Sequence, residues 1–193
     1  RNITPDDFVE RLISDISEKT GDDESVTSLG ESIRDVIEGI VTHFQEIDNI
    51  SHPQFSEFQY RATREGLLDA LGHGGNGSIL VAGVGSGKTL GFMLPPLILA
   101  KRDIKDGTQP RGAHLFLYPR KALALDQFSK SLKPFAIAAG IPSNQIHSEM
   151  SKFYNTLPSG SVYKGIQAVH NQHPPRLIIS SLETLKNRIG HPT

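Results

Sequence analysis

The feature that most constrains this chain is a glycine-rich loop set between an apolar run and a helix-forming stretch. Ile79-Leu80-Val81 is followed by three glycines in five residues and then by Lys88-Thr89, so that residues 82–89 match the pattern [AG]-x-x-x-x-G-K-[ST]. Residues 78–82 predict a short strand and residues 88–102 predict a helix. A strand that turns directly into a helix is typical of α/β folds, in which helices connect parallel strands.

The residue types of this loop suit a polyphosphate. Successive backbone N–H groups of such a loop can point at one anion, and Gly85 and Gly87 allow backbone angles that a side chain would forbid. The start of the following helix adds its partial positive charge. We expect Lys88 to reach the β- and γ-phosphates and the Thr89 hydroxyl to bind Mg²⁺, so these two residues are the candidate catalytic groups.

Periodicity predicts an all-helical start followed by alternating strands and helices. Thr4-Pro5-Asp6-Asp7 has the cap, the proline and the early acids of a helix start, and apolar residues recur at helical spacing through residues 8–16 and 33–44, separated by an acidic loop at 21–30. The later elements are expected as a helix at 55–71, strands at 78–82 and 113–118, helices at 88–102 and 121–139 (broken near Pro134), a short strand near 145–148, a strand at 176–180 and a helix from 181.

The fold class that these elements predict is α/β: a P-loop parallel sheet with flanking helices, preceded by an acidic helical extension. We expect the extension to comprise residues 1–50 and the α/β part to comprise residues 51–193. The net charge of −1 conceals the difference between them, because residues 1–50 hold four basic and thirteen acidic side chains. Residues 101–193 hold thirteen basic and five acidic side chains.

Composition excludes several classes of site. The chain has no cysteine, which excludes disulfides and thiolate zinc sites, and its eight histidines show no HExxH spacing. No segment is apolar over the length that a membrane span needs, and no secretory signal is present, so we expect a cytoplasmic protein without membrane contact. Because the chain begins with Arg1, we expect a processed product or a fragment of a longer protein.

A second candidate for nucleotide recognition lies upstream, in the segment from Phe55 to Ala62. The Gln59 amide offers one donor and one acceptor to the edge of an adenine, and a neighbouring aromatic ring could stack on the base. The alternative is a surface glutamine beside core aromatics. The residues assigned to the nucleotide are therefore Gln59, Gly83, Gly85, Ser86, Gly87, Lys88, Thr89 and Leu90.

Polar residues also follow the two later strands. Ligands of open α/β sheets lie beyond the carboxyl ends of the strands, and cations, hydroxyls and free N–H groups there can contact the phosphates of a nucleic acid. The alternatives are solvated charges after the strand at 113–118 and a plain helix cap after the strand at 176–180. The candidate nucleic-acid contacts are Pro119, Arg120, Lys121, Gln127, Ser180, Ser181 and Thr184.

Taken together, these segments resemble the first RecA-like lobe of superfamily 2 helicases, in the family's order and over about residues 55–190. Residues 55–62 look like its Gln motif, AGVGSGKT like motif I, YPRKALALDQ like motif Ia and IISSLETL like motif Ib. Motif Ia is closer to the YPTxALAxDQ form of Lhr-like and YprA-like bacterial DNA helicases of repair and phage defence than to the PTRELAxQ form of DEAD-box RNA helicases. Arg120 stands where that form has Thr.

The resemblance implies an ATP-dependent nucleic-acid motor that uses ATP and Mg²⁺. It implies DNA rather than RNA as the partner, a second helicase lobe in the parent chain, and other subunits of a defence or repair system. Because the acidic extension lies outside the resemblance, we expect it to pack away from the nucleic-acid path or to mask that path when no nucleic acid is bound.

One component of such a motor is missing from these 193 residues. A P-loop motor needs a carboxylate after an adjacent strand to hold Mg²⁺ and orient the attacking water, and no apolar run ends in Asp-Glu. We therefore expect the front part of a larger motor, cut before its DExx motif. By itself it is expected to bind ATP weakly, if at all, without turning it over.

Two other interpretations remain open. A different P-loop class, such as a small-molecule kinase or a nucleotide switch, explains the loop but leaves the later motifs as coincidences. A non-enzymatic interaction domain that keeps the loop as a relic predicts that Lys88→Ala leaves the parent's function intact. Stimulation of ATP hydrolysis by nucleic acid distinguishes a motor from the first of these.

Overall fold

The computed structural model describes residues 2–21, 23–75, 77, 79–81, 83, 87–108, 113–148 and 175–184, and these form two compact units. Unit 1 comprises residues 1–108 together with 138–141, and unit 2 comprises residues 109–137 together with 142–193. The boundary expected at residue 50 falls inside unit 1. By sequence, unit 1 has ten basic and eighteen acidic residues and unit 2 has ten and three, so their net charges are −8 and +7.

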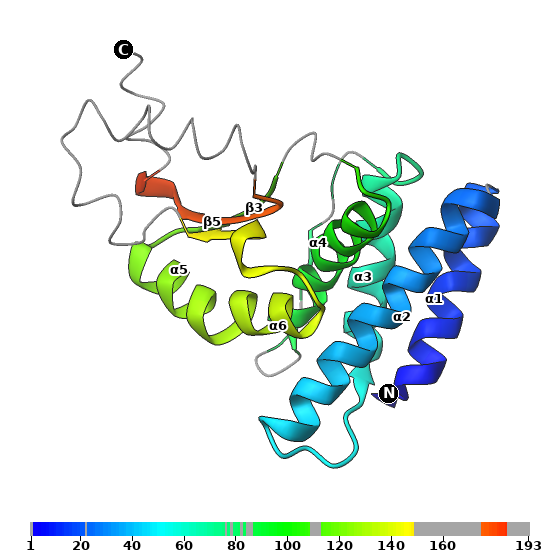
Figure 1. Ribbon diagram of the computed structural model, residues 1–193, viewed down its shortest axis with the longest axis horizontal. Coiled ribbons are helices and arrows are strands. Elements are labelled where there is room, and N and C mark those ends of the chain that lie inside the picture. Colours follow the sequence, from blue (N-terminus) through cyan, green and yellow to red (C-terminus); the bar gives the residue numbers. More distant parts are fainter. Residues whose placement is uncertain are drawn as a thin grey trace. The chain divides into compact units, whose positions relative to one another are not determined.

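The described residues of unit 1 form four helices and two short strands (Figure 1). The helices are α1 (Pro5–Thr20), α2 (Asp23–Glu46), α3 (Glu57–Ala70) and α4 (Lys88–Lys105), and two short strands, β1 (Asn2–Ile3) and β2 (Phe55–Ser56), pair antiparallel. The start of α1 is as predicted, because the Thr4 hydroxyl accepts a hydrogen bond from the Asp7 N–H at 3.2 Å and Pro5 occupies the first turn. The helix ends at Gly21, which has a φ of 64°.

The starts of two helices in unit 1 differ from the prediction. The expected acidic loop at 21–30 is wrong, since α2 already begins at Asp23. Buried contacts explain the longer helix: Leu29 is 2% exposed, and a Cβ on Gly30 would touch the Ile13 side chain at 3.5 Å. Tertiary packing of this kind stabilises helix that local sequence alone leaves marginal. The helix expected from residue 55 begins at Glu57 instead, because Phe55 and Ser56 pair with β1.

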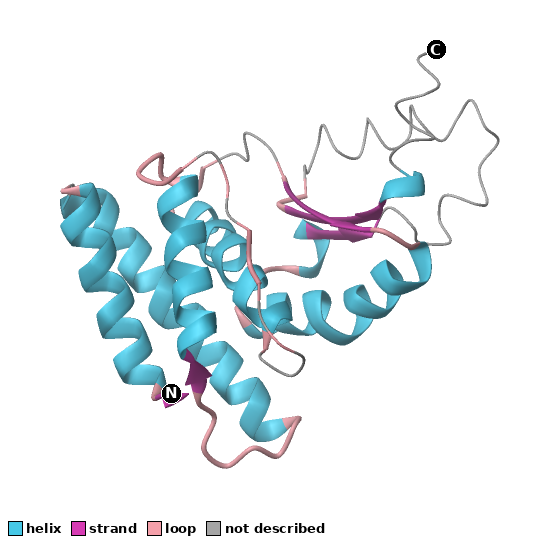
Figure 2. Ribbon diagram, turned by 180° about the vertical axis from the view of Figure 1, so that it is seen from behind, coloured by secondary structure: helices cyan, strands magenta, loops and turns pink. Residues whose placement is uncertain are grey.

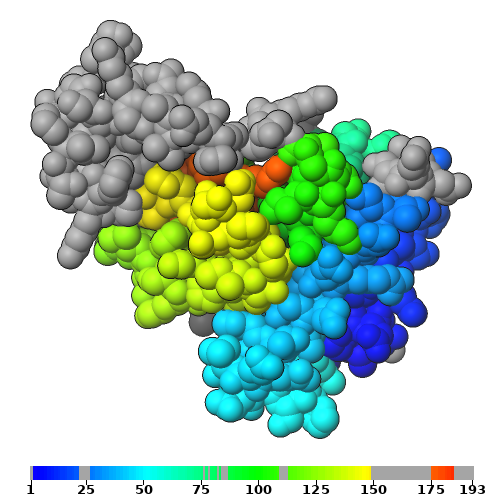
Figure 3. All heavy atoms as spheres, in the orientation of Figure 1, coloured from blue at the N-terminus to red at the C-terminus, as the bar shows by residue number. Residues whose placement is uncertain are grey.

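Helices α3 and α4 approach closely through small residues. A Cβ on Gly66 of α3 would lie 2.7 Å from the Pro95 ring of α4, and a Cβ on Gly91 of α4 would lie 3.3 Å from Ala62. Helix α2 also packs along α4. The atoms of α2 and α4 adjoin on the face that Figure 3 shows. Lys105 of α4 is ion-paired with Glu31 at 2.8 Å and with Asp35 at 3.4 Å.

Unit 2 contains the sheet, which is parallel as predicted (Figure 2). Its strands are β3 (His114–Tyr118), β4 (Ile146–Ser148) and β5 (Leu177–Ser181), in the order β3-β5-β4. The register pairs His114 and Ile146 with Leu177, on either side of the buried central strand. The sheet and its helices confirm the α/β class.

Helical segments connect β3 to β4. They are α5 (Lys121–Gln127), a π-helical turn (Phe128–Leu132), α6 (Lys133–Ala138) and a 3₁₀ turn (Ser143–Gln145). The break predicted near Pro134 is the π-helical turn just before it, because proline provides no N–H for an ordinary helical bond. Phe116 is buried, but Leu115 and Leu117 are 49% and 42% exposed, so the described helices cover one face of the sheet.

The strand expected at 78–82 is wrong for the residues that are described there. Residues 79–81 form no strand, and Ile79 and Val81 are 93% and 85% exposed. A strand needs a hydrogen-bonded neighbour, and no described strand pairs with these residues. Residues 78 and 82 lie outside the description, as do residues 185–189 of the last expected helix, which is described as helical at 182–184.

Candidate functional site

The end of the glycine-rich loop meets the start of α4 at Gly87. This residue is the N-cap of α4 and has a φ of 72°, in the left-handed region that glycine tolerates best. A Cβ at this position would overlap the Gln59 side-chain nitrogen. The requirement for glycine at residue 87 is therefore both conformational and steric. Gly85 and Ser86 lie outside the described residues.

Lys88 and Thr89 open α4, at the end of the helix that attracts anions. No side chain caps this helix, so the backbone N–H groups of its first turn and the positive end of its dipole remain suited to a phosphate. The Lys88 ammonium donates a hydrogen bond to the Gly83 carbonyl, so it lies beside the loop. Leu90 is buried at 5% exposure, so its side chain belongs to the core and only its backbone could contact a nucleotide.

Gln59 links α3 to the start of α4. The Ser56 hydroxyl accepts from the Gln59 backbone N–H at 3.2 Å, and the Gln59 Oε1 accepts from the Ser56 N–H at 2.7 Å, which makes a capping box. The Gln59 Nε2 donates to the Gly87 carbonyl at 3.4 Å. With 9% of its surface exposed, Gln59 is not the surface glutamine of the alternative interpretation. Its contact with adenine stays a prediction.

Two aromatic side chains near Gln59 belong to the core of unit 1. The ring centroids of Phe55 and Phe8 are 4.5 Å apart, and Tyr60 meets Phe8 edge-on at 5.7 Å. Phe55 and Tyr60 are 1% and 4% exposed. Packing against α1 therefore occupies both rings, and neither offers an open face on which a base could stack.

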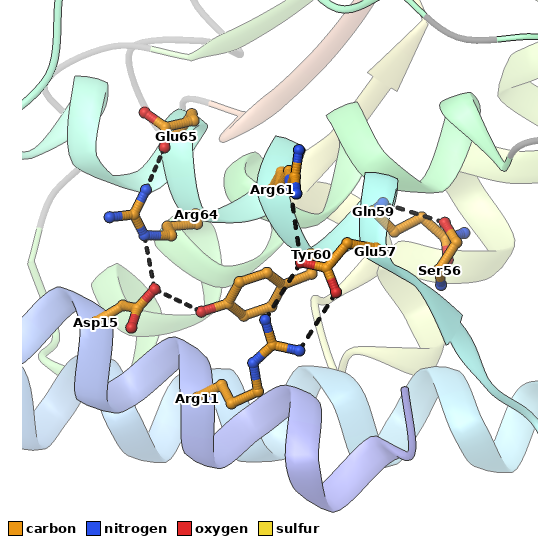
Figure 4. A network of polar contacts seen from close by, with 9 residues as sticks. All are labelled: Arg11, Asp15, Ser56, Glu57, Gln59, Tyr60, Arg61, Arg64 and Glu65. Atoms are coloured by element: carbon orange, nitrogen blue, oxygen red, sulfur yellow. Dashed lines mark hydrogen bonds and ion pairs between the residues drawn. The ribbon is translucent and has the colours of Figure 1, made fainter. Parts of the chain in front are cut away.

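Arg11 joins α1 to the first turn of α3 through a charged pair (Figure 4). Its guanidinium donates to both carboxylate oxygens of Glu57, at 3.3 and 3.4 Å, and lies 4.1 Å from the centre of the Tyr60 ring. The hydrogen bond from Arg11 lowers the pKa of Glu57, and the same bond raises the pKa of Arg11.

Asp15 makes the next link between α1 and α3. It accepts from the Tyr60 hydroxyl at 2.7 Å and forms an ion pair with the Arg64 Nε at 2.8 Å, a contact without the alignment of a hydrogen bond. Burial, followed by the bond to Asp15, raises the pKa of Tyr60 to about 12. Sequence reasoning missed Arg11 and Asp15, because a polar residue on an amphipathic helix carries no sign of its distant partner.

The candidate nucleic-acid residues after β3 lie at an exposed turn. Pro119, Arg120 and Lys121 are all exposed, and the two cations form no ion pair with another described residue. Arg120 is the N-cap of α5 and has extended backbone, and no side chain caps that helix. Gln127 is different, since its Oε1 is buried and has no hydrogen-bond partner in the described part of the chain.

The hydroxyl of Ser181, the last residue of β5, bonds to Thr184. The Ser181 Oγ accepts from the Thr184 N–H at 3.2 Å and lies 2.9 Å from the Thr184 hydroxyl, which is the helix cap of the alternative interpretation. Ser180 and Ser181 are fully buried. Neither side chain is exposed, and their role as phosphate contacts stays a prediction.

Within the described residues, no group of three histidine, aspartate or glutamate side chains could hold a metal ion. The described helices also include none that is long and apolar enough to cross a membrane. The chemistry that these residues do offer is anion binding at the start of α4, with Lys88 as its cation.

Fold and loop together define a class, namely a P-loop protein of the RecA-like α/β type. The model of the DEAD/DEAH box helicase family matches residues 57–187, and the chain belongs to this family of superfamily 2 helicases. Membership of this family supports an ATP-dependent helicase-type function in general, and the small-molecule kinase and nucleotide-switch interpretations are not favoured. A search of curated proteins found no match, and a search of solved structures found none either.

Proposed function

We propose that this chain binds ATP with Mg²⁺ at the start of α4 and serves a DNA helicase of the Lhr-like or YprA-like kind. The observation that supports the ATP site best is the meeting of Gly87, Lys88 and Gln59. An uncapped helix start and a lysine suit the phosphates, and an amide held against the loop suits the base.

The donor types present fit a nucleotide and its metal. Lys88 would bind the β- and γ-phosphates, and the Thr89 hydroxyl would hold Mg²⁺, which when bound neutralises phosphate charge. Gln59 would contact the adenine. We also propose that these 193 residues bind ATP weakly and do not hydrolyse it, because they include no apolar run that ends in Asp-Glu to hold the metal and orient a water.

Nucleic acid would bind at the basic unit 2, which has a net charge of +7. Exposed Arg120 and Lys121 at the uncapped start of α5 are the best-placed cations for strand phosphates. The resemblance of residues 118–127 to the YPTxALAxDQ form favours DNA over RNA. A cytoplasmic location, a second helicase lobe and partner subunits of a repair or defence system belong to the same proposal.

Nucleotide binding is tested by titrating a fluorescent ATP analogue into the wild type, Lys88→Ala and the control Lys19→Ala. Lys19 is an exposed lysine of α1 in the same unit, so its loss changes charge without touching the loop. We expect Lys88→Ala alone to lose binding. Equal affinity in all three proteins, or ATP hydrolysis that depends on Lys88 with no partner chain added, would contradict the corresponding part of the proposal.

Strand binding is tested with fluorescent single-stranded DNA and RNA of one sequence. Replacing both Arg120 and Lys121 with alanine should reduce the slope of log affinity against log salt by about 1.4, since each phosphate contact on a single strand contributes about 0.7. Replacing Lys130 and Lys133 is the matched control. If both double variants reduce the salt slope equally, then Arg120 and Lys121 are not the specific strand contacts. Tighter binding of RNA than of DNA would refute the choice of DNA.

A further inference from the structure

Residues 2–15 contact the segment 55–64, which carries Gln59, at both of its ends. At one end, Asn2 pairs with Ser56 and Ile3 pairs with Phe55, in the two-residue strands β1 and β2. The next turn of α1 places Phe8 against Phe55 and Tyr60. The N-terminal segment is therefore anchored directly at the capping box in which Gln59 takes part.

Polar contacts continue this attachment along one face of α3. Residues 57, 60 and 64 lie at helical spacing on that face, and each is held from α1: Glu57 and Tyr60 by Arg11, and Tyr60 and Arg64 by Asp15 (Figure 4). Gln59 lies between the first two in sequence but is directed toward α4. Helix α3 is thus held by α1 on one side, while Gln59 bonds to Gly87 on the other.

The orientation of the Gln59 amide matters for the choice of base. Its Oε1 accepts from the Ser56 N–H and its Nε2 donates to the Gly87 carbonyl, so the acceptor end and the donor end are fixed. One lone pair and one amide hydrogen remain by valence. An amide with fixed ends suits a base edge that offers one donor and one acceptor, as adenine does at N6 and N7, and it disfavours guanine, which offers two acceptors.

We propose that Arg11 and Asp15 are positioning residues for the Gln59 amide, so that α1 takes part in selecting adenine over guanine. This inference rests on the proposed ATP site. Arg11 and Asp15 touch neither the loop nor α4 by any described hydrogen bond or ion pair, so they act through the position of α3. Loss of their contacts lets the start of α3 shift relative to Gly87, which weakens the bond from the Gln59 Nε2 to the Gly87 carbonyl and moves the amide out of the position that suits adenine.

The test separates base selection from phosphate binding. The affinities of fluorescent ATP and GTP analogues, and of inorganic tripolyphosphate as a competitor, are measured for the wild type, Arg11→Ala, Asp15→Asn and Tyr60→Phe. Tyr60→Phe removes only the hydroxyl that donates to Asp15 and keeps the ring beneath Arg11. Lys19→Ala and Glu18→Gln, which alter exposed residues near the end of α1, are the charge-matched controls.

We expect the preference for ATP over GTP to fall roughly five- to tenfold in Arg11→Ala and Asp15→Asn, about the effect of one hydrogen bond. Tripolyphosphate binding should stay within a factor of about two, and Arg11→Lys should restore part of the preference. Unchanged preference, or equal weakening of ATP, GTP and tripolyphosphate, overturns the inference. If Arg11→Ala does not fold, then Asp15→Asn, for which the same fall in preference is expected, decides the result.

A second readout needs no nucleotide. The side-chain amide signals of Gln59 in a ¹H–¹⁵N spectrum, assigned by their loss in Gln59→Ala, should move in Arg11→Ala and stay in place in Lys19→Ala. Signals that stay in place in Arg11→Ala overturn the inference even if no nucleotide binds. Failure of the wild type to bind any nucleotide refutes the proposed function separately.

Discussion

Removing the Phe8 ring should destabilise α4, the helix that follows the glycine-rich loop, although Phe8 and α4 are far apart in sequence. Phe8 of α1 is fully buried, and its ring contacts Phe55 of β2 and Tyr60 of α3. Replacing a buried phenylalanine with alanine costs about 3–5 kcal/mol, because it removes the transfer free energy of the ring and leaves a cavity. Because α3 packs directly on α4, we expect this loss to reach α4.

Hydrogen exchange measured by mass spectrometry resolves α1 from α4. If unit 1 unfolds cooperatively, the protection factors of α4 amides should fall about a hundredfold or more in Phe8→Ala, in parallel with those of α1. Phe8→Leu should give a smaller loss because it keeps most of the volume, and Lys19→Ala should give none. Loss of protection in α1 with α4 unchanged would refute the reasoning, because it would make α1 an independent appendage.

Three further substitutions test the site and its packing. Gly66→Ala should lower the melting temperature. A Cβ 2.7 Å from the Pro95 ring overpacks the interface at a cost of about 1–3 kcal/mol, whereas the gain in helix propensity is about 1 kcal/mol. A higher melting temperature would contradict this. Gly87→Ala should weaken ATP binding about tenfold, because the φ of 72° at this residue disfavours a side chain by about 1–2 kcal/mol. Unchanged affinity in a fluorescent-ATP titration would show that ATP binding does not need this backbone conformation. Arg11 lowers the pKa of Glu57, so this carboxylate stabilises the fold above its unfolded pKa of about 4.5 and loses that effect as the pH falls through its lower folded pKa. Urea unfolding from pH 6 to about pH 3 should therefore show a smaller loss of stability in Glu57→Gln than in the wild type, and equal losses would argue against the ion pair.

Local patterns predicted the elements that depend on nearby residues. The start of α1 follows from Thr4 and Pro5, and the parallel sheet follows from apolar runs that alternate with helical segments. Periodicity could not predict the start of α2, because Leu29 and Gly30 depend on burial against other parts of unit 1. The strand expected at residues 78–82 was wrong at its described residues, 79–81, for a similar reason, since pairing depends on a neighbour that an apolar run cannot specify.

For the candidate site, the sequence likewise indicates local features only. The loop pattern indicated Lys88 and the need for glycine at residue 87. The capping box of Ser56 and Gln59 has the local signature Ser-x-x-Gln but was not among the predictions. Arg11 and Asp15 could not be found, because they lie about 45 residues from their partners and nothing in the spacing indicates such pairs. The burial of Ser180 and Ser181 was also hidden, since a serine after a strand has the same sequence signature whether it faces solvent or core.

The opposite charges of the two units bear on how this chain behaves in solution. A net charge of −1 near neutral pH suggests a molecule with weak electrostatic interactions. Here an acidic unit of −8 and a basic unit of +7 belong to the same molecule, so copies can attract one another with opposite units in contact. Such attraction is strongest at low ionic strength and is screened over about 8 Å at physiological salt. The chain should therefore be salted in: it should be least soluble in dilute buffer and should bind both cation- and anion-exchange resins there.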